Sequence, residues 1–254
     1  MKHTLTALAL ASFSVSFAQS AAPAPVAVAS HDLSLRGSFA WDSRNVFRGM
    51  ERSSEQGLVQ SALTLEYNVP GFSGVSVYAN FYNADSFERT YTFGTKTDSS
   101  FGTVDVGIQR ATAANAHSIA NGYSQLTSDR EIYAGLTLSN ANFKPSAYIY
   151  YSLDQKQYVF EAAGSKTFAG ANVGLAGYDI ETKAYAGILN ASKAEKVPGQ
   201  KNAYHYLGAS ADVTRAVGQG AKLGAGISYA YNSDSQTSTA GSTVWYRVFA
   251  TFKF

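Results

Sequence analysis

The sequence has no cysteine and few charged residues. Without cysteine there can be no disulfide framework, no zinc–thiolate site and no cysteine nucleophile. Charged residues make up 15% of the chain, against about 25% in a typical soluble domain. The 20 basic and 18 acidic side chains nearly balance. No basic tract indicates a nucleic-acid partner, and no acidic tail indicates a solvating arm.

Long apolar runs are also missing after the N-terminus. No later segment approaches the roughly 18 apolar residues that a membrane-spanning helix needs. Since only helices and closed barrels satisfy the backbone in a membrane, the rest of the chain is expected to be a soluble protein or a β-barrel. The 17 tyrosines and 15 phenylalanines favour a protein at an interface. A secreted, tyrosine-rich β-sandwich would have a similar composition.

The N-terminus has the pattern of an export signal. Lys2 precedes the apolar run Leu5–Ala11, and the segment closes on Ser16-Phe17-Ala18. Residues 1–18 are therefore predicted to be a signal peptide that is cleaved before Gln19. The Ala/Pro-rich residues 19–32 are expected to form a flexible lead-in, and residues 33–254 the folded domain.

From Leu33 onward, apolar and polar residues alternate with a period of two, which is typical of β-strands with two different faces. One example is Val104, Val106 and Ile108, which alternate with Thr103, Asp105 and Gln109. The pattern predicts an all-β chain of about twelve strands. Their expected ranges are 33–49, 57–68, 74–83, 87–96, 101–112, 130–139, 143–152, 157–168, 171–190, 201–214, 221–232 and 242–254. A register-switching bulge is expected in the ninth, where the apolar face changes near residues 176–180.

The connections between these strands alternate in character. One set consists of short turns rich in Gly, Pro and Asn, and the other includes longer polar loops at 50–56, 113–129, 191–200 and 233–241. Short turns at one end and longer loops at the other are the layout of an outer-membrane barrel. We therefore predict a transmembrane, antiparallel, up-and-down β-barrel that reaches the bacterial outer membrane through the periplasm. Outer-membrane lipid would surround it.

The last strand carries a second membrane-protein signal. Tyr246, Val248, Phe252 and Phe254 lie on one face of it, and the chain ends on Phe254. This pattern resembles the C-terminal assembly signature of bacterial outer-membrane proteins. The resemblance implies that the barrel-assembly machinery recognises this strand.

The first hairpin also resembles a known family. The sequence Trp41-Asp42-Ser43-Arg44-Asn45-Val46-Phe47-Arg48-Gly49, followed by a polar loop and Gly57-Leu58-Val59-Gln60, is similar to the opening of the TorF-type porins. Asn45 stands where that family usually has an aromatic residue. The resemblance implies an outer-membrane barrel but no particular solute, and it assigns no binding residue.

In a membrane barrel the polar face of each strand lines the lumen. The charged residues on these faces are the predicted pore-lining residues, namely Arg36, Asp42, Arg44, Arg48, Glu66, Glu88, Asp105, Glu131, Glu161, Asp212 and Arg247. If positive and negative charges are segregated, they would select small, charged solutes in a channel. If they are paired, they would fill the lumen of a plugged structural or adhesive barrel. Inward tyrosines are expected to be filler more often than binding groups.

The favoured function is passive diffusion of small solutes, without enzymatic activity, metal or cofactor. An outer-membrane lipase is the less favoured alternative, because a nucleophile needs an oriented base. His117-Ser118 and His205 are the candidates for such a pair, and no acid is convincingly placed beside them in the sequence. A soluble β-sandwich is a further alternative, which the terminal Phe254 and the alternating connections disfavour.

Overall fold

The computed structural model describes residues 32–51, 57–85, 87–113, 119–120, 125–126, 128–139, 143–191, 203–233 and 241–254. The predicted signal peptide, almost all of the lead-in, His117 and Ser118 lie outside these ranges. Within the described residues, no helix is long and apolar enough to cross a membrane.

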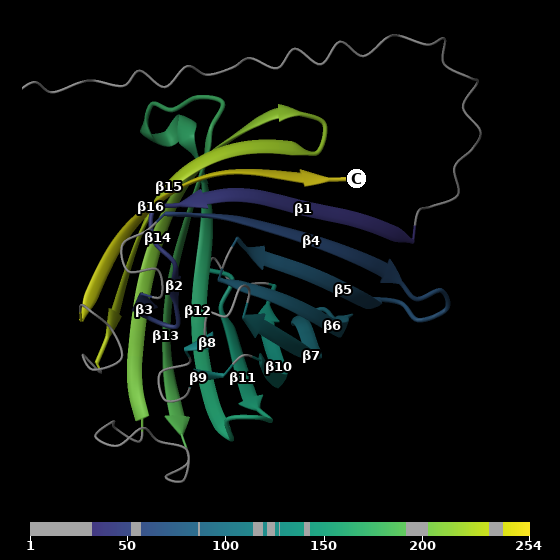
Figure 1. The fold of residues 1–254 in the computed structure, drawn as a ribbon. Helices are drawn as coiled ribbons and strands as arrows, with labels where there is room; N and C mark the ends of the chain where they lie inside the picture. The colour runs from purple at the N-terminus through teal and green to yellow at the C-terminus, as the bar shows by residue number, and fades with distance from the viewer. Residues whose placement is uncertain are drawn as a thin grey trace, which may run out of the picture. The chain divides into compact units, whose positions relative to one another are not determined.

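Twelve antiparallel strands form one closed barrel (Figure 1). Each barrel strand pairs with the next along the chain, and the last pairs with the first. The strands are β1 (Leu33–Asp42), β4 (Leu58–Asn68), β5 (Val75–Ala84), β6 (Glu88–Asp98), β7 (Gly102–Ala113), β10 (Ser128–Leu138), β11 (Ser146–Ser152), β12 (Gln157–Ala169), β13 (Asp179–Ala191), β14 (Ala203–Gly218), β15 (Ala221–Asn232) and β16 (Ser242–Lys253). The prediction of a twelve-stranded, all-β, up-and-down barrel is confirmed.

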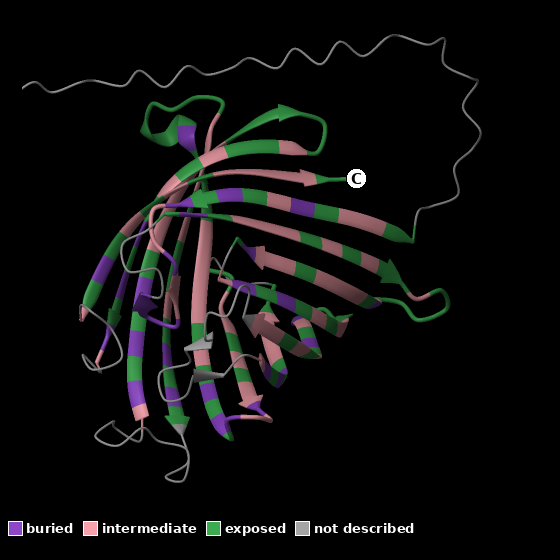
Figure 2. Cartoon of the chain, in the orientation of Figure 1, coloured by how far each residue is buried: buried purple, intermediate pink, exposed green. Residues whose placement is uncertain are grey.

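The two faces of the sheet differ in polarity. Exposed and buried residues alternate along the strands (Figure 2). On β7, for example, Val104 and Val106 are 39% and 45% exposed, whereas Asp105 between them is 8% exposed. Because the apolar residues face outward and the polar residues inward, the barrel is inside out relative to a soluble protein.

The two ends of the barrel also differ. We call the end with Leu33, Lys253 and the turns at 69–74 and 99–101 the turn end. The opposite end, where β1 finishes and β4 begins, is the loop end. Exposed aromatic residues gather on the outer face near each end. At the loop end these are Trp41, Tyr91, Tyr158, Tyr231 and Tyr246, and at the turn end Tyr67, Phe101, Phe143, Phe168 and Phe254.

The first predicted strand is too long. It was expected to cover 33–49, but β1 ends at Asp42, and a separate two-stranded sheet follows, formed by β2 (Val46–Phe47) and β3 (Met50–Glu51). Arg44 and Arg48 are therefore not on the barrel wall, and Met50 and Glu51 are not in an outer loop. A second small sheet, β8 (Ile119–Ala120) with β9 (Gln125–Leu126), lies within the predicted loop 113–129.

The ninth and tenth strands also need correction. The ninth was expected from residue 171, but Gly170–Val173 form a short 3₁₀ helix, η1, and β13 begins at Asp179. Gly174 and Gly177, both at φ 81°, turn the chain where a bulge was predicted, because glycine adopts this backbone conformation without a steric cost. The tenth strand, β14, runs to Gly218 rather than 214, with a register shift between Ala216 and Gly218.

Candidate constriction in the lumen

The β2–β3 hairpin turns through Arg48 and Gly49, which have φ angles of 49° and 76°. Two consecutive residues with positive φ in a two-residue loop are the mark of a type I′ turn. The second position requires glycine for a further reason. A Cβ on Gly49 would lie 2.6 Å from the Cβ of Tyr206 and 2.9 Å from the carbonyl oxygen of Tyr231. The turn therefore approaches the inner faces of β14 and β15 too closely for any side chain.

The hairpin packs against one wall of the lumen. Met50 is 2% exposed and forms an apolar cluster with Val159, Leu189, Tyr204 and Tyr206. These four residues lie on the inner faces of β12, β13 and β14. Burial of these side chains, at about 25 cal/mol per Å² of apolar surface, anchors the hairpin inside the barrel.

Arg48 extends from the tip of the hairpin to β10. Its two Nη atoms donate hydrogen bonds of 2.8 Å and 3.0 Å to the two carboxylate oxygens of Glu131, and Gln109 Nε2 donates to Glu131 Oε2 at 2.5 Å. The guanidinium also lies 4.7 Å and 4.9 Å from the ring centres of Phe47 and Tyr150. A bidentate Arg–carboxylate pair of this kind has a fixed geometry as well as a favourable energy.

The two side chains of this pair are buried together. Burial alone would lower the pKa of the Arg48 guanidinium, but the charge and hydrogen bonds of Glu131 raise it above its ordinary value. The side chains of Arg48 and Glu131 are 5% and 6% exposed. Removal of one partner from such a buried pair costs about 3–5 kcal/mol, because the other charge is left without compensation.

A third attachment joins the hairpin to β16. Arg44 Nη1 donates to Glu51 Oε2 at 2.8 Å, and Thr243 Oγ1 donates to the same oxygen at 3.3 Å. The hairpin is thus held at its base by Arg44 and Thr243, along its length by the apolar cluster, and at its tip by Glu131.

A cavity of about 340 Å³ lies on the other side of the hairpin. It is bounded by the hairpin segment 45–47 and by the inner faces of β4, β5, β6, β7 and β10. The polar and aromatic residues that line it are Asn45, Phe47, Gln60, Asn80, Tyr82, Glu88, Thr90, Thr92, Gln109, Asp129 and Glu131. The hairpin therefore fills part of the lumen at this level and leaves a polar cavity beside it.

Tyrosines line the wall toward the turn end. Tyr78 donates to Asp105 Oδ1 at 2.8 Å, Tyr148 donates to Asp105 Oδ2 at 3.4 Å, and the hydroxyls of Tyr78 and Tyr133 are hydrogen-bonded to each other. The rings of Tyr148 and Tyr150 stack at 5.9 Å. These rings therefore contact each other and Asp105, and their role as filler of the wall stays a prediction.

The remaining predicted pore-lining residues lie on the inner faces of wall strands. Two opposite-charge pairs form, Arg36 with Glu66 at 3.2 Å and Arg247 with Asp42 at 3.6 Å. Glu161 accepts a hydrogen bond from Tyr206 at 2.9 Å. Glu88 accepts one from Thr90 at 2.9 Å, and Asp212 faces inward opposite Gly226. Of the predicted pore-lining residues, Arg48 and Glu131 therefore lie in direct contact. Glu88 on β6 and Asp212 on β14 lie on different strands of the wall.

Sequence reasoning missed three residues of the constriction, namely Glu51, Gln109 and Thr243. The sequence did contain a signal for the hairpin. Arg48-Gly49 lies between the short segments Val46–Phe47 and Met50–Glu51, and glycine is typical of a turn. No sequence signal indicates that the hairpin points inward.

The outer surface carries the other predicted groups. Tyr246 and Val248 are each 59% exposed and Phe254 is 78% exposed. Phe252 covers Gly37, the residue directly opposite it on β1. His205 is exposed on β14, and its backbone N–H donates to Ser233 Oγ at 2.9 Å. In the described ranges, no three His, Cys, Asp or Glu side chains gather as metal ligands would.

Comparison with solved structures finds outer-membrane proteins at very low sequence identity. The KdgM porin is 8% identical, with a TM-score of 0.48, and the match covers 87% of this chain and 99% of that chain. Acinetobacter baumannii OccAB3 is 13% identical, with a TM-score of 0.42, over 88% of this chain and 65% of that chain. No family model and no curated protein matches the sequence. Membership of the TorF-type porin family therefore stays a prediction.

Proposed function

We propose that the protein is an outer-membrane channel through which small solutes diffuse passively. The observation that carries this proposal is the inverted polarity of a closed barrel. Large apolar side chains such as Phe39, Phe93 and Phe160 are more than half exposed on its outer face, between the two aromatic groups described above. Soluble proteins rarely expose apolar surface on this scale, whereas a membrane barrel has an apolar band flanked by aromatic girdles.

In this proposal the turn end faces the periplasm and the loop end faces outward, as in other outer-membrane barrels. Solutes would pass the β2–β3 hairpin through the cavity of about 340 Å³ beside it. The amide, hydroxyl and carboxylate groups there would replace part of the water around a polar solute. Folding would require the barrel-assembly machinery, with the strand that ends at Phe254 as the recognised element.

A closed structural barrel is the second candidate function. The observation in its favour is the buried pair between Arg48 and Glu131, which joins the hairpin tip to β10 and leaves fewer free charges in the lumen. The two candidates differ in whether the passage beside the hairpin admits ions.

Single-channel recording in a planar bilayer separates them. The refolded protein, checked for a heat-modifiable band on a gel, should give steady conductance steps. Salt gradients across the bilayer would then report the ion preference of the pore. A correctly folded barrel that never conducts would refute the channel and support the closed barrel.

A further inference from the structure

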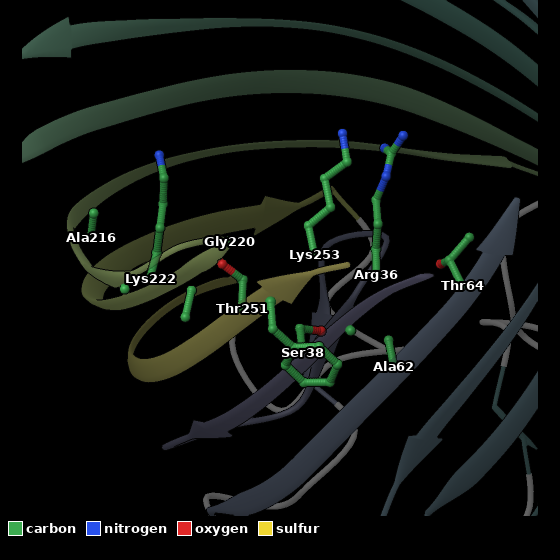
Figure 3. Close-up of a pocket in the computed structure, with 13 residues that line it drawn as sticks. Arg36, Ser38, Ala62, Thr64, Ala216, Gly220, Lys222, Thr251 and Lys253 are labelled. Carbon is green, nitrogen blue, oxygen red and sulfur yellow. The ribbon is translucent and has the colours of Figure 1, made fainter. Parts of the chain in front are cut away.

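Three cations lie together at the turn end of the lumen, on three neighbouring strands. Arg36 on β1 is directly opposite Lys253 on β16, and Lys222 on β15 is opposite Thr251, two residues before Lys253. Residue parity places all three on the inner face, and Figure 3 shows that their side chains extend to the same side of the sheet.

These side chains border a cavity of about 530 Å³. Ser38, Thr64 and Thr251 add hydroxyl groups to its lining, and none of the residues that line the cavity is acidic. Lysine, arginine and hydroxyl groups in one cavity are the hydrogen-bond donors that bind an oxyanion.

Two of the three cations around this cavity have ion-pair partners in the protein. Arg36 is 3.2 Å from Glu66, and Lys222 is 3.2 Å from Asp179. Within the described part of the chain, Lys253 has no ion-pair partner. Like charges directly opposite each other in a sheet are unfavourable, and Arg36 and Lys253 are so placed. A bound anion would give Lys253 an ion-pair partner and offset this repulsion.

We propose that this cavity is a binding site for small multivalent oxyanions, of the phosphate or polycarboxylate type. The proposal rests on the channel proposed above, because the site lies where the lumen opens at the turn end. It adds a charge preference to the proposed channel, namely for anions at the turn end. The loop-end cavity is lined by Glu88, Asp129 and Glu131, so an anion finds its donors at the turn end.

Phosphate binding to the refolded barrel in neutral detergent tests the site directly, by ³¹P NMR titration and isothermal calorimetry. This readout does not depend on conduction, so the site and the channel can fail separately. Saturable binding of inorganic phosphate is expected. Lys253→Gln should weaken it about tenfold, because one hydrogen bond from a charged donor contributes roughly that factor.

Two control variants separate the site from general electrostatics. Lys183→Gln removes a lumen-facing lysine outside the cavity, and Lys166→Gln removes an outward lysine that lies over the rings of Phe143 and Phe168. Both should bind phosphate as the parent protein does. Absence of saturable binding, or equal weakening in Lys183→Gln and Lys253→Gln, would overturn the proposal.

Discussion

At the scale of single residues, the lumen wall is built from tyrosines that cover glycines. Five inward tyrosines each lie directly opposite a glycine on the neighbouring strand, and a Cβ on that glycine would overlap the ring. The pairs are Tyr78 with Gly94, Tyr133 with Gly107, Tyr148 with Gly135, Tyr185 with Gly208 and Tyr206 with Gly187. Glycine weakens a strand interior, and a ring laid over it restores packing there.

Gly135→Ala tests this packing. The new methyl group would enter the ring of Tyr148, which Asp105 and the ring of Tyr150 hold in place. Overpacking of this kind costs about 1–3 kcal/mol, so urea-induced unfolding in detergent should occur at lower concentration. Gly164→Ala is the matched control, since its nearest neighbour would be the Cβ of Phe143 at 3.9 Å. Equal stability of the two variants would contradict the pairing argument.

A second residue-scale prediction concerns pH. Asp154, in the β11–β12 connection, accepts hydrogen bonds from Arg130 Nη2 at 2.6 Å and from the Arg130 backbone N–H at 2.8 Å. The side-chain hydrogen bond from Arg130 is the main cause that lowers the pKa of Asp154. Since the folded pKa is the lower one, the contribution of this contact is present above the unfolded value. It is lost as the pH falls through the folded value. NMR titration should find a pKa below about 3.9, and Arg130→Gln should return it toward that value. If the pKa of Asp154 is the same in Arg130→Gln, Arg130 is not the cause of its low value.

At the scale of elements, sequence periodicity predicted the wall strands well but not the inserted hairpin. A strand that lines a lumen and a hairpin that crosses it have the same alternation, so residues 43–49 looked like an extension of β1. The pair between Arg48 and Glu131 spans 83 positions, and it depends on how strands far apart in the sequence are arranged around the barrel. The local sequence pattern therefore predicted that both residues face the lumen, but it could not predict that they form an ion pair.

Gly49→Val tests whether the hairpin is the constriction. A β-branched residue is strained at φ 76°, and its Cβ would overlap Tyr206, so the hairpin should leave its wall. Conductance and the uptake of larger neutral sugars in liposome swelling should both rise, and Arg48→Ala should act in the same direction. Gly71→Val is the matched control, since φ is 82° there and no atom lies within 4 Å of the added Cβ. If Gly49→Val conducts no more than Gly71→Val, the hairpin is not what limits the pore.

At the scale of the whole molecule, the fold followed from three sequence features. They were period-two alternation, an even number of strands, and short turns that alternate with longer loops. Closure is a consequence of pairing between β1 and β16, where Phe39 lies opposite Ala250 and Asp42 opposite Arg247. Among the described residues, every strand of the barrel is therefore paired on both sides, which is the condition for strands in a membrane. What alternation alone left open was which face contacts lipid, because a soluble barrel has the same period with opposite polarity.

Two adjacent alanines decide that question experimentally. Ala162 and Ala163 lie near the middle of β12. Ala162 is opposite the outward Ala147 and Ala186, whereas Ala163 is opposite the lumen-facing Tyr185. Arginine on the lipid face near the bilayer midplane costs about 2–4 kcal/mol, whereas the lumen tolerates charge. Ala162→Arg should therefore reduce the yield of heat-modifiable barrel far more than Ala163→Arg, although both variants carry the same change one residue apart. If the lumen variant were the more damaging, the apolar face would be the protected interior, and the membrane placement on which the channel depends would fall with it.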